Sequence, residues 1–189
     1  MRVRLGVGAV ILETRTLGMK RGGMAGQPFI YNGQGFSLQR DKNRFVLPNV
    51  FRGTVRESSG KDVVYLTMHD RWPCLIGFGA SRINEFGEEL EKLQEVALRS
   101  GNTGFDGDKL ASDMYSSYDV PFDGSGRFVL PEDLAALGGV SDQLYFRGNG
   151  KFFTAWAPEQ LYAMDDGWRM AQTACRSLAA KELAKAKKK

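Results

Sequence analysis

The sequence predicts an α+β fold, mainly β with short helices, in which two similar halves share one core. Three observations predict it. The motif Arg44-Phe-Val-Leu-Pro48 recurs 83 residues later as Arg127-Phe-Val-Leu-Pro131. Short alternating apolar stretches bounded by turn residues surround both copies, as in β-strands. Each copy offers only about four short strands, too few to bury a core alone. We therefore predict that the two copies pack face to face as one pseudo-twofold β-barrel.

The elements follow in the same order in both copies. Each copy is predicted to run strand, turn, strand, short helix, strand, turn, strand. In copy one the short helix spans Pro48 to Gly53, and in copy two Pro131 to Gly138, because proline suits a first helical position and glycine an exit. The remaining predicted strands are 36–38, 63–66 and 74–78 in copy one, and 118–120, 143–146 and 152–156 in copy two.

Further helices link and extend the copies. Residues 81–99 have apolar side chains at helical spacing opposite a run of glutamates, which predicts an amphipathic helix. Lys109 to Ser117 and a segment starting at Pro158 are predicted to be shorter helices. The chain therefore divides into 28–100 and 101–165, one repeat each, and a basic helical tail, 166–189. The terminal lysines of the tail are expected to be solvated.

The first 27 residues are predicted to be an N-terminal extension outside the core fold. Residues 1–23 resemble a weak signal peptide, but no small-residue cleavage site follows them. Two interpretations stay open: the segment is a loosely attached arm, or translation starts at Met24.

Composition excludes several classes of protein. The chain has 189 residues, 42% hydrophobic and 25% charged, as in a folded protein. The longest apolar run, Leu5 to Leu12, is far shorter than the roughly 20 residues of a membrane span. Two cysteines a hundred residues apart and one histidine provide no usual metal site and no disulfide framework. We therefore expect a cytoplasmic protein with no metal, no cofactor, no membrane association and no small-molecule substrate.

The turn before each repeated arginine carries the most information. It reads Asp123-Gly-Ser-Gly-Arg127 in copy two and Arg40-Asp-Lys-Asn-Arg44 in copy one. Gly126 and Asn43 occupy the same place and tolerate positive φ. An aspartate four residues before the arginine can cap turn amides and pair with the guanidinium. Asp41, Asp123 and Gly126 are thus predicted to shape the turns.

These tandem turns, each followed by an aliphatic strand and a proline-initiated helix, resemble the MraZ family of the AbrB/SpoVT-like swapped-hairpin superfamily. The resemblance spans about residues 28–165. It implies two tandem AbrB-like swapped-hairpin repeats. It also implies a bacterial cytoplasmic, nucleoid-associated DNA-binding regulator of the division and cell-wall genes that assembles as a homo-oligomeric ring. The family's DNA contact carries over to Lys42 and Arg44, and to Asp123 and Arg127. Arg40 stands where the family has aspartate, and Ser125 where it has lysine, so the operator sequence is expected to differ.

Charge supports double-stranded DNA as the partner. Residues 24–175 hold 15 basic and 20 acidic side chains, so the body is acidic. The net positive charge of the whole chain comes from its two ends. Within it, residues 40–61 carry six basic side chains against two acidic ones, and such a local cationic patch attracts phosphates. The predicted DNA-binding residues are Arg40, Lys42, Asn43, Arg44, Arg52, Arg56 and Arg127. For Arg44 and Arg127 a purely structural role in the hairpin is the alternative.

The sequence offers no enzyme chemistry. His69, predicted to be exposed in a polar turn, has no serine or cysteine nearby in any catalytic motif. The function that follows is a sequence-specific transcriptional regulator, a repressor or an activator, that obstructs or repositions polymerase at repeated operator sites. The alternative is an antitoxin-like or other protein-interaction module of the same superfamily. Neighbouring division genes would favour the regulator, and a neighbouring small ribonuclease the antitoxin.

Overall fold

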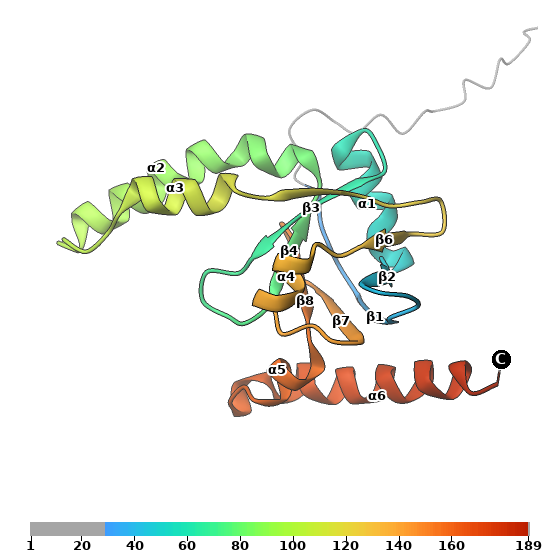
Figure 1. Cartoon of the computed structure of the whole chain (residues 1–189). Helices are drawn as coiled ribbons and strands as arrows, with labels where there is room; N and C mark the ends of the chain where they lie inside the picture. Colours follow the sequence, from blue (N-terminus) through green and yellow to red (C-terminus); the bar gives the residue numbers. More distant parts are fainter. Residues whose placement is uncertain (1–28, 189) are drawn as a thin grey trace, which may run out of the picture.

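The computed structural model describes residues 29–188, so the predicted extension 1–27 lies outside the described residues, as does Lys189. The fold is α+β, as predicted (Figure 1). The strands are β1 Gln34–Leu38, β2 Arg44–Val46, β3 Val63–Met68, β4 Leu75–Phe78, β5 Tyr118–Pro121, β6 Arg127–Val129, β7 Gln143–Gly148 and β8 Phe153–Trp156. The α-helices are α1 Asn49–Ser59, α2 Phe86–Arg99, α3 Gly107–Tyr115, α4 Glu132–Leu137, α5 Pro158–Tyr162 and α6 Arg169–Ala186, and the 3-10 helices are Ala80–Glu85 and Asp166–Trp168.

Six strands form one antiparallel sheet in which the two halves of the chain are interleaved. The strand order is β1-β7-β8-β4-β3-β5. Exchanging each strand for its counterpart in the other half (β1 for β5, β3 for β7, β4 for β8) gives the same order read from the opposite edge. At its centre β4 pairs with β8, with Leu75 opposite Ala155 and Gly77 opposite Phe153. The hydrogen bonds of this central pair join the two halves, so neither half has a complete sheet of its own.

The closed barrel predicted from the sequence is wrong. Within residues 29–188 the edge strands β1 and β5 do not pair with each other, so the sheet is open. After each edge strand the chain makes a tight turn and leaves the sheet. The following strands, β2 and β6, then pair only with one another as a separate two-stranded ribbon. The ribbon is tied to the edge strands at the turns, where the carbonyls of Arg44 and Arg127 accept hydrogen bonds from the amides of Arg40 and Asp123, both at 2.9 Å.

The main core lies between the sheet, the ribbon and α1. Phe45 and Phe128 face each other from β2 and β6, with ring centroids 6.3 Å apart, and both are buried. The ring of Phe51 stacks on that of Phe153 at 4.9 Å. Burying a side chain of this size stabilises the fold by about 1.5–3 kcal/mol. The repeated aromatic positions therefore hold the ribbon against the sheet.

Helix α1 is longer than the sequence predicted. It starts after Pro48, runs through Gly53 and ends at Ser59, where Gly60 adopts a left-handed φ of 66° as the C-cap. Phe51 and Val55, four residues apart, are both buried. A glycine inside a helix costs only about 1 kcal/mol. Burial of this apolar face outweighs that cost, so Gly53 does not end the helix.

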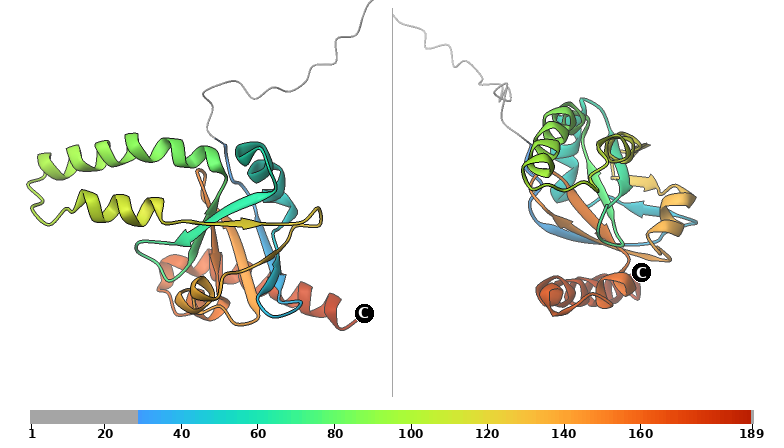
Figure 2. Two further views of the ribbon diagram at one scale, coloured as in Figure 1. Left: turned by 45° about the horizontal axis from the view of Figure 1, so that its top comes forward. Right: turned by 90° about the vertical axis from the view of Figure 1, so that its left-hand side faces the viewer.

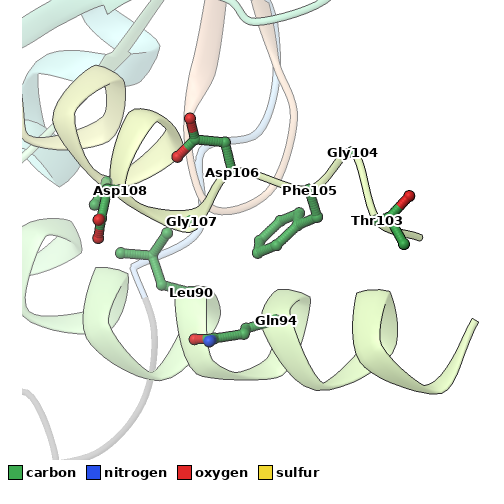
Figure 3. Close-up of a pocket in the computed structure, with 9 residues that line it drawn as sticks. Leu90, Gln94, Thr103, Gly104, Phe105, Asp106, Gly107 and Asp108 are labelled. Atoms are coloured by element: carbon green, nitrogen blue, oxygen red, sulfur yellow. The ribbon is translucent and has the colours of Figure 1, made fainter. Parts of the chain in front are cut away.

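Helices α2 and α3 form an arm that projects from the body (Figures 1 and 2). Arg82 anchors its base: the side chain is buried and forms ion pairs with Glu85 (2.9 Å) and Glu89. Figure 3 shows the cleft near the tip, where Phe105 lies by Leu90 and Gln94 of α2. In this cleft the Asp106 carboxylate accepts a hydrogen bond from the Lys109 amide at 2.9 Å. Asp106 is therefore the N-cap of α3.

The C-terminal helices build a second core on the other side of the sheet. Its buried residues are Cys74, Tyr145, Trp156, Leu161, Ala171 and Cys175. The predicted basic tail thus has an apolar side, Ala171 and Cys175, which is buried against the sheet in α6. His69 is not exposed as the sequence predicted, because its ring stacks on Trp72 at 4.2 Å and only 10% of its side chain is accessible.

None of the helices in the described part of the chain is long and apolar enough to span a bilayer.

Candidate nucleic-acid interface

The β2–β6 ribbon has one buried aromatic face and one outer face, the cationic face, on which Arg44 and Arg127 alternate with Val46 and Val129. Its register places Arg44 opposite Val129, Phe45 opposite Phe128, and Val46 opposite Arg127. Because side chains alternate along a strand, the two phenylalanines point into the core while both arginines lie on the opposite face. Arg44 and Arg127 are exposed there. They are diagonal neighbours across the ribbon, a relation that places Cβ atoms within roughly 7–8 Å of each other.

The two turns that flank the ribbon are tied to it in the same way. Asn43 and Gly126 both adopt positive φ, 53° and 81°. The carbonyl of Gly126 accepts a hydrogen bond from the Leu47 amide at 2.7 Å, and the carbonyl of Asn43 accepts one from the Leu130 amide at 2.8 Å. Each left-handed residue thus aims its carbonyl at the other repeat. The conformation of each turn therefore depends on the pairing of the two ribbon strands, and the pairing depends on the turns.

In copy two, Asp123 organises both the turn and its arginine. One carboxylate oxygen accepts hydrogen bonds from the amides of Ser125 and Arg127, both at 2.9 Å. The other accepts from Arg127 Nε at 2.8 Å. The amide of Arg127, followed by its guanidinium, lowers the pKa of Asp123 below its usual value. Arg127 is thus held by the turn, yet 56% of its side chain stays accessible to solvent.

Copy one has a different set of charges at the same place. Arg40 occupies the position of Asp123 and is exposed. The Asp41 carboxylate accepts a hydrogen bond from the Lys42 amide at 2.9 Å. Lys42 Nζ forms an ion pair with Glu132 of α4 at 2.6 Å, which raises the pKa of Lys42 and lowers that of Glu132. Among residues 29–188, neither Arg40 nor Arg44 takes part in an ion pair.

The two arginines of α1 are engaged elsewhere. Arg52 Nε donates to the Leu47 carbonyl at 2.6 Å, and its half-buried guanidinium lies against Gly126. Partial burial lowers the pKa of Arg52. Arg56 is paired with Asp62 at 2.5 Å, an acid one residue beyond the basic stretch 40–61. Of the residues predicted to bind DNA, five lie in or beside the ribbon: Arg40, Lys42, Asn43, Arg44 and Arg127. Arg52 instead packs against the turn of copy two, and Arg56 is paired with Asp62.

Sequence reasoning missed two features of this surface. It gave Arg44 and Arg127 the same role but did not predict that their strands pair, which makes the two arginines neighbours. The repeated Arg-Phe-Val alternation, combined with a two-fold arrangement, is a signal that could have placed both arginines on one face. It also missed Glu132 as the partner of Lys42, because the two are 90 residues apart and share no motif.

The surface holds no metal-ligand cluster. Across the described residues, no group of three or more histidine, cysteine, aspartate or glutamate side chains is placed to hold a metal ion. The chemistry that the ribbon can perform is electrostatic and hydrogen-bonding recognition. Guanidinium groups in an exposed row bind phosphates and the edges of guanine bases.

Comparison with known proteins identifies the family. No model of a known protein family matches the chain. It is 30% identical over 123 residues to the transcriptional regulator MraZ of Xanthobacter autotrophicus, covering 65% of this chain and 73% of that relative. The MraZ regulators of Rhodospirillum rubrum (27% over 122 residues; 65% and 76%) and Gluconobacter oxydans (26% over 141; 73% and 80%) match similarly. The repeated turn, the interleaved sheet and these matches agree: the chain belongs to the family of the MraZ transcriptional regulators.

Proposed function

We propose that the protein is a transcriptional regulator that binds double-stranded DNA through the cationic face of the β2–β6 ribbon. One observation carries the proposal: Arg44 and Arg127 lie on the solvent face of a two-stranded ribbon whose other face is anchored in the core. A two-stranded ribbon fits the major groove of B-DNA, where arginine can bind guanine in a bidentate manner. The names of its MraZ relatives support the same function.

The turns would hold the duplex by its backbone. Arg40 and Arg44 are free to meet phosphates, while Arg127 is already oriented by Asp123. Lys42 would have to leave Glu132 to do so, and because that pair is exposed its opening costs little. The acidic remainder of the body repels DNA, so the duplex is directed to this side. The action needs no catalysis, because a bound regulator obstructs or repositions polymerase.

We also propose the wider features that the family resemblance implies. The halves 28–100 and 101–165 would be tandem AbrB-like swapped-hairpin repeats, with 166–189 as an added tail, in a cytoplasmic, nucleoid-associated protein. A homo-oligomeric ring would present several ribbons to repeated operator sites and gain affinity by multivalency. Val96 and Leu98 of α2, 63% and 75% exposed, are apolar side chains that a second copy could cover. Light scattering on the purified protein measures the assembly directly.

The test of DNA binding is the double variant Arg44→Ala/Arg127→Ala. Its affinity for the DNA upstream of its own gene, and for unrelated duplexes, should fall. Its salt dependence should flatten by about 1.8 in slope if each arginine neutralises one phosphate, at roughly 0.9 per phosphate. The matched control is Lys92→Ala/Arg99→Ala on the arm, which removes the same charge far from the ribbon. Equal affinities and slopes in the two double variants would contradict the proposal.

A further inference from the structure

Helix α6 is held firmly on the body through its first half. Ala171 and Cys175 are buried in the second core, and Leu178 packs at its edge together with Phe36 of β1. Gln172 Nε2 donates hydrogen bonds to the carbonyls of Leu161 and Met164 at 3.1 and 3.0 Å. The position of the helix on the body is therefore held by apolar packing and by hydrogen bonds from its Gln172 side chain to backbone carbonyls.

The second half of α6 carries a row of lysines. Lys181 and Lys185 are four residues apart and share one stripe of the helix, and Lys188 follows two residues beyond its last residue, Ala186; all three are exposed. Glu182 is the one acid of α6, and it pairs with Lys185 at 2.7 Å. Favourable interaction of cations with the helix dipole is confined to the last turn, whereas Lys181 precedes it. Dipole compensation therefore does not explain the whole row.

The C-terminal end of α6 is on the same side of the molecule as the candidate interface. Figures 1 and 2 show α6 crossing β1 and extending beyond it, with its C-terminal end on the side where the turn between β1 and β2 lies. That turn contains Arg40 and Lys42 and leads directly into Arg44. The C-terminal end of α6 and that turn, both rich in basic residues, therefore lie on one side of a body that is acidic overall.

We propose that the C-terminal half of α6 is a second DNA-contacting element, which binds the sugar-phosphate backbone of the duplex outside the segment read by the ribbon. The inference rests on the proposed function, since it assumes that the ribbon engages the same duplex. Lysine is a flexible point charge that binds phosphate without reading sequence. The helix would therefore add affinity and salt dependence but no base specificity. Because α6 is docked, these lysines would sit at a fixed distance from the ribbon.

The test compares Lys181→Gln/Lys185→Gln/Lys188→Gln with the full-length parent on two fluorescein-labelled duplexes. The longer one, about 30 base pairs, extends beyond the ribbon, and the shorter one, about 12 base pairs, covers little more than the ribbon. On the longer duplex the variant should bind at least several-fold more weakly, and its salt slope should fall by about 2.7, roughly 0.9 for each phosphate that is no longer neutralised. On the shorter duplex the difference should shrink. The matched control, Lys92→Gln/Arg99→Gln/Lys109→Gln, removes the same charge from the arm.

The outcomes separate this inference from the proposed function. If Arg44→Ala/Arg127→Ala weakens binding while the α6 variant matches the arm control on both duplexes, the inference is overturned and the ribbon assignment stands. If the α6 variant binds weakly and the ribbon variant is normal, the lysines contact DNA but the ribbon assignment falls, and with it the placement of α6 beside a segment that the ribbon reads. A parent protein that binds neither duplex overturns both. Circular dichroism melting of each variant checks that the fold is retained.

Discussion

Single residues in the two turns determine how the ribbon is held. Gly126 has a φ of 81° and lies against the Arg52 guanidinium and the Leu47 carbonyl, so a side chain has neither a favourable backbone conformation nor space. Its counterpart Asn43 also has positive φ but is one of the residue types that adopt it readily. Asp123 then satisfies the amides of its turn and orients Arg127. The turn is therefore a structural device that also positions a charge.

Substitution of Gly126 by alanine should destabilise the protein. An L-residue in the left-handed region costs about 1–2 kcal/mol, and displacement of Arg52 adds to it. For a chain of this size that corresponds to a fall in Tm of about 2–8 °C by calorimetry. Gly124→Ala is the matched control, because no atom lies within 4 Å of the added Cβ. A Gly126→Ala protein that melts with the control would show that the tight approach is not a constraint.

The contribution of Asp123 should depend on pH. The folded state lowers the pKa of its carboxyl, so the stability it confers is present above the unfolded-state value near 3.8 and is lost as pH falls through the lower folded value. The difference in Tm between the parent and Asp123→Asn should thus be largest near neutral pH and should disappear in strong acid. A difference that stays constant from pH 7 to pH 2 would be inconsistent with an ionised, hydrogen-bonded carboxylate.

Residue types predicted some of these features and could not predict others. Asn43 and Gly126 occupy equivalent positions in the two turns, and both residue types tolerate positive φ. The sequence could therefore predict this backbone conformation, because backbone preference is a local property. The pairing of Lys42 with Glu132, and of Arg52 with the Leu47 carbonyl, depends on how β2, α1 and α4 meet in space. No local pattern encodes such pairings. The engagement of Arg52 therefore became visible only in the structure.

At the scale of elements, burial decides the ends of helices and the role of the tail. Gly53 indicated an exit, yet α1 continues to Ser59 because Phe51 and Val55 are buried on its inner face. In copy two, where only Leu134 and Ala135 of the helix are buried, α4 ends before Gly138. The tail was predicted only as a basic helix, but its Ala171, Cys175 and Leu178 pack with Tyr145 and Trp156 in the second core. Amino-acid composition is enough to predict that α6 is a helix. Where α6 packs depends on the apolar surface of the sheet, which composition does not show.

Removal of α6 by a stop codon after Trp168 should destabilise the whole protein. The cover of Tyr145 and Trp156 would be removed, and each exposed side chain of this size costs about 1.5–3 kcal/mol. The truncated chain should melt at lower temperature and bind the dye ANS. A stop after Ala186 removes only residues beyond the helix and should leave Tm unchanged. Equal melting of the two truncated proteins would mean that the second core contributes nothing to stability.

At the scale of the whole molecule, the two repeats are inseparable but unequal. The central β4–β8 pair and the β2–β6 ribbon both join one half to the other. Their charges differ, since the basic side chains gather in residues 40–61 and the acidic ones around α4. The repeat in the sequence was enough to predict a shared core. It was not enough to predict an open sheet, because closure depends on whether β2 and β6 pair with the edges or with each other.

Fragments 29–103 and 104–188 should each fail to fold alone. The first lacks β8 and the second lacks β4, so the central strand of each would expose an unpaired edge and apolar side chains. Neither fragment should show cooperative unfolding by circular dichroism, whereas a 1:1 mixture should recover strand signal. A stable monomer of either fragment would contradict the shared core.

The central claim is that the two halves together build a ribbon whose outer face meets DNA. Hydrogen–deuterium exchange of the intact protein, with and without a duplex from the region upstream of its gene, tests it most directly. We expect slower exchange on DNA binding in peptides covering residues 38–47 and 122–130, and unchanged exchange along α2 and α3. Protection confined to the arm, or its absence from both ribbon segments in a DNA-bound sample, would contradict it.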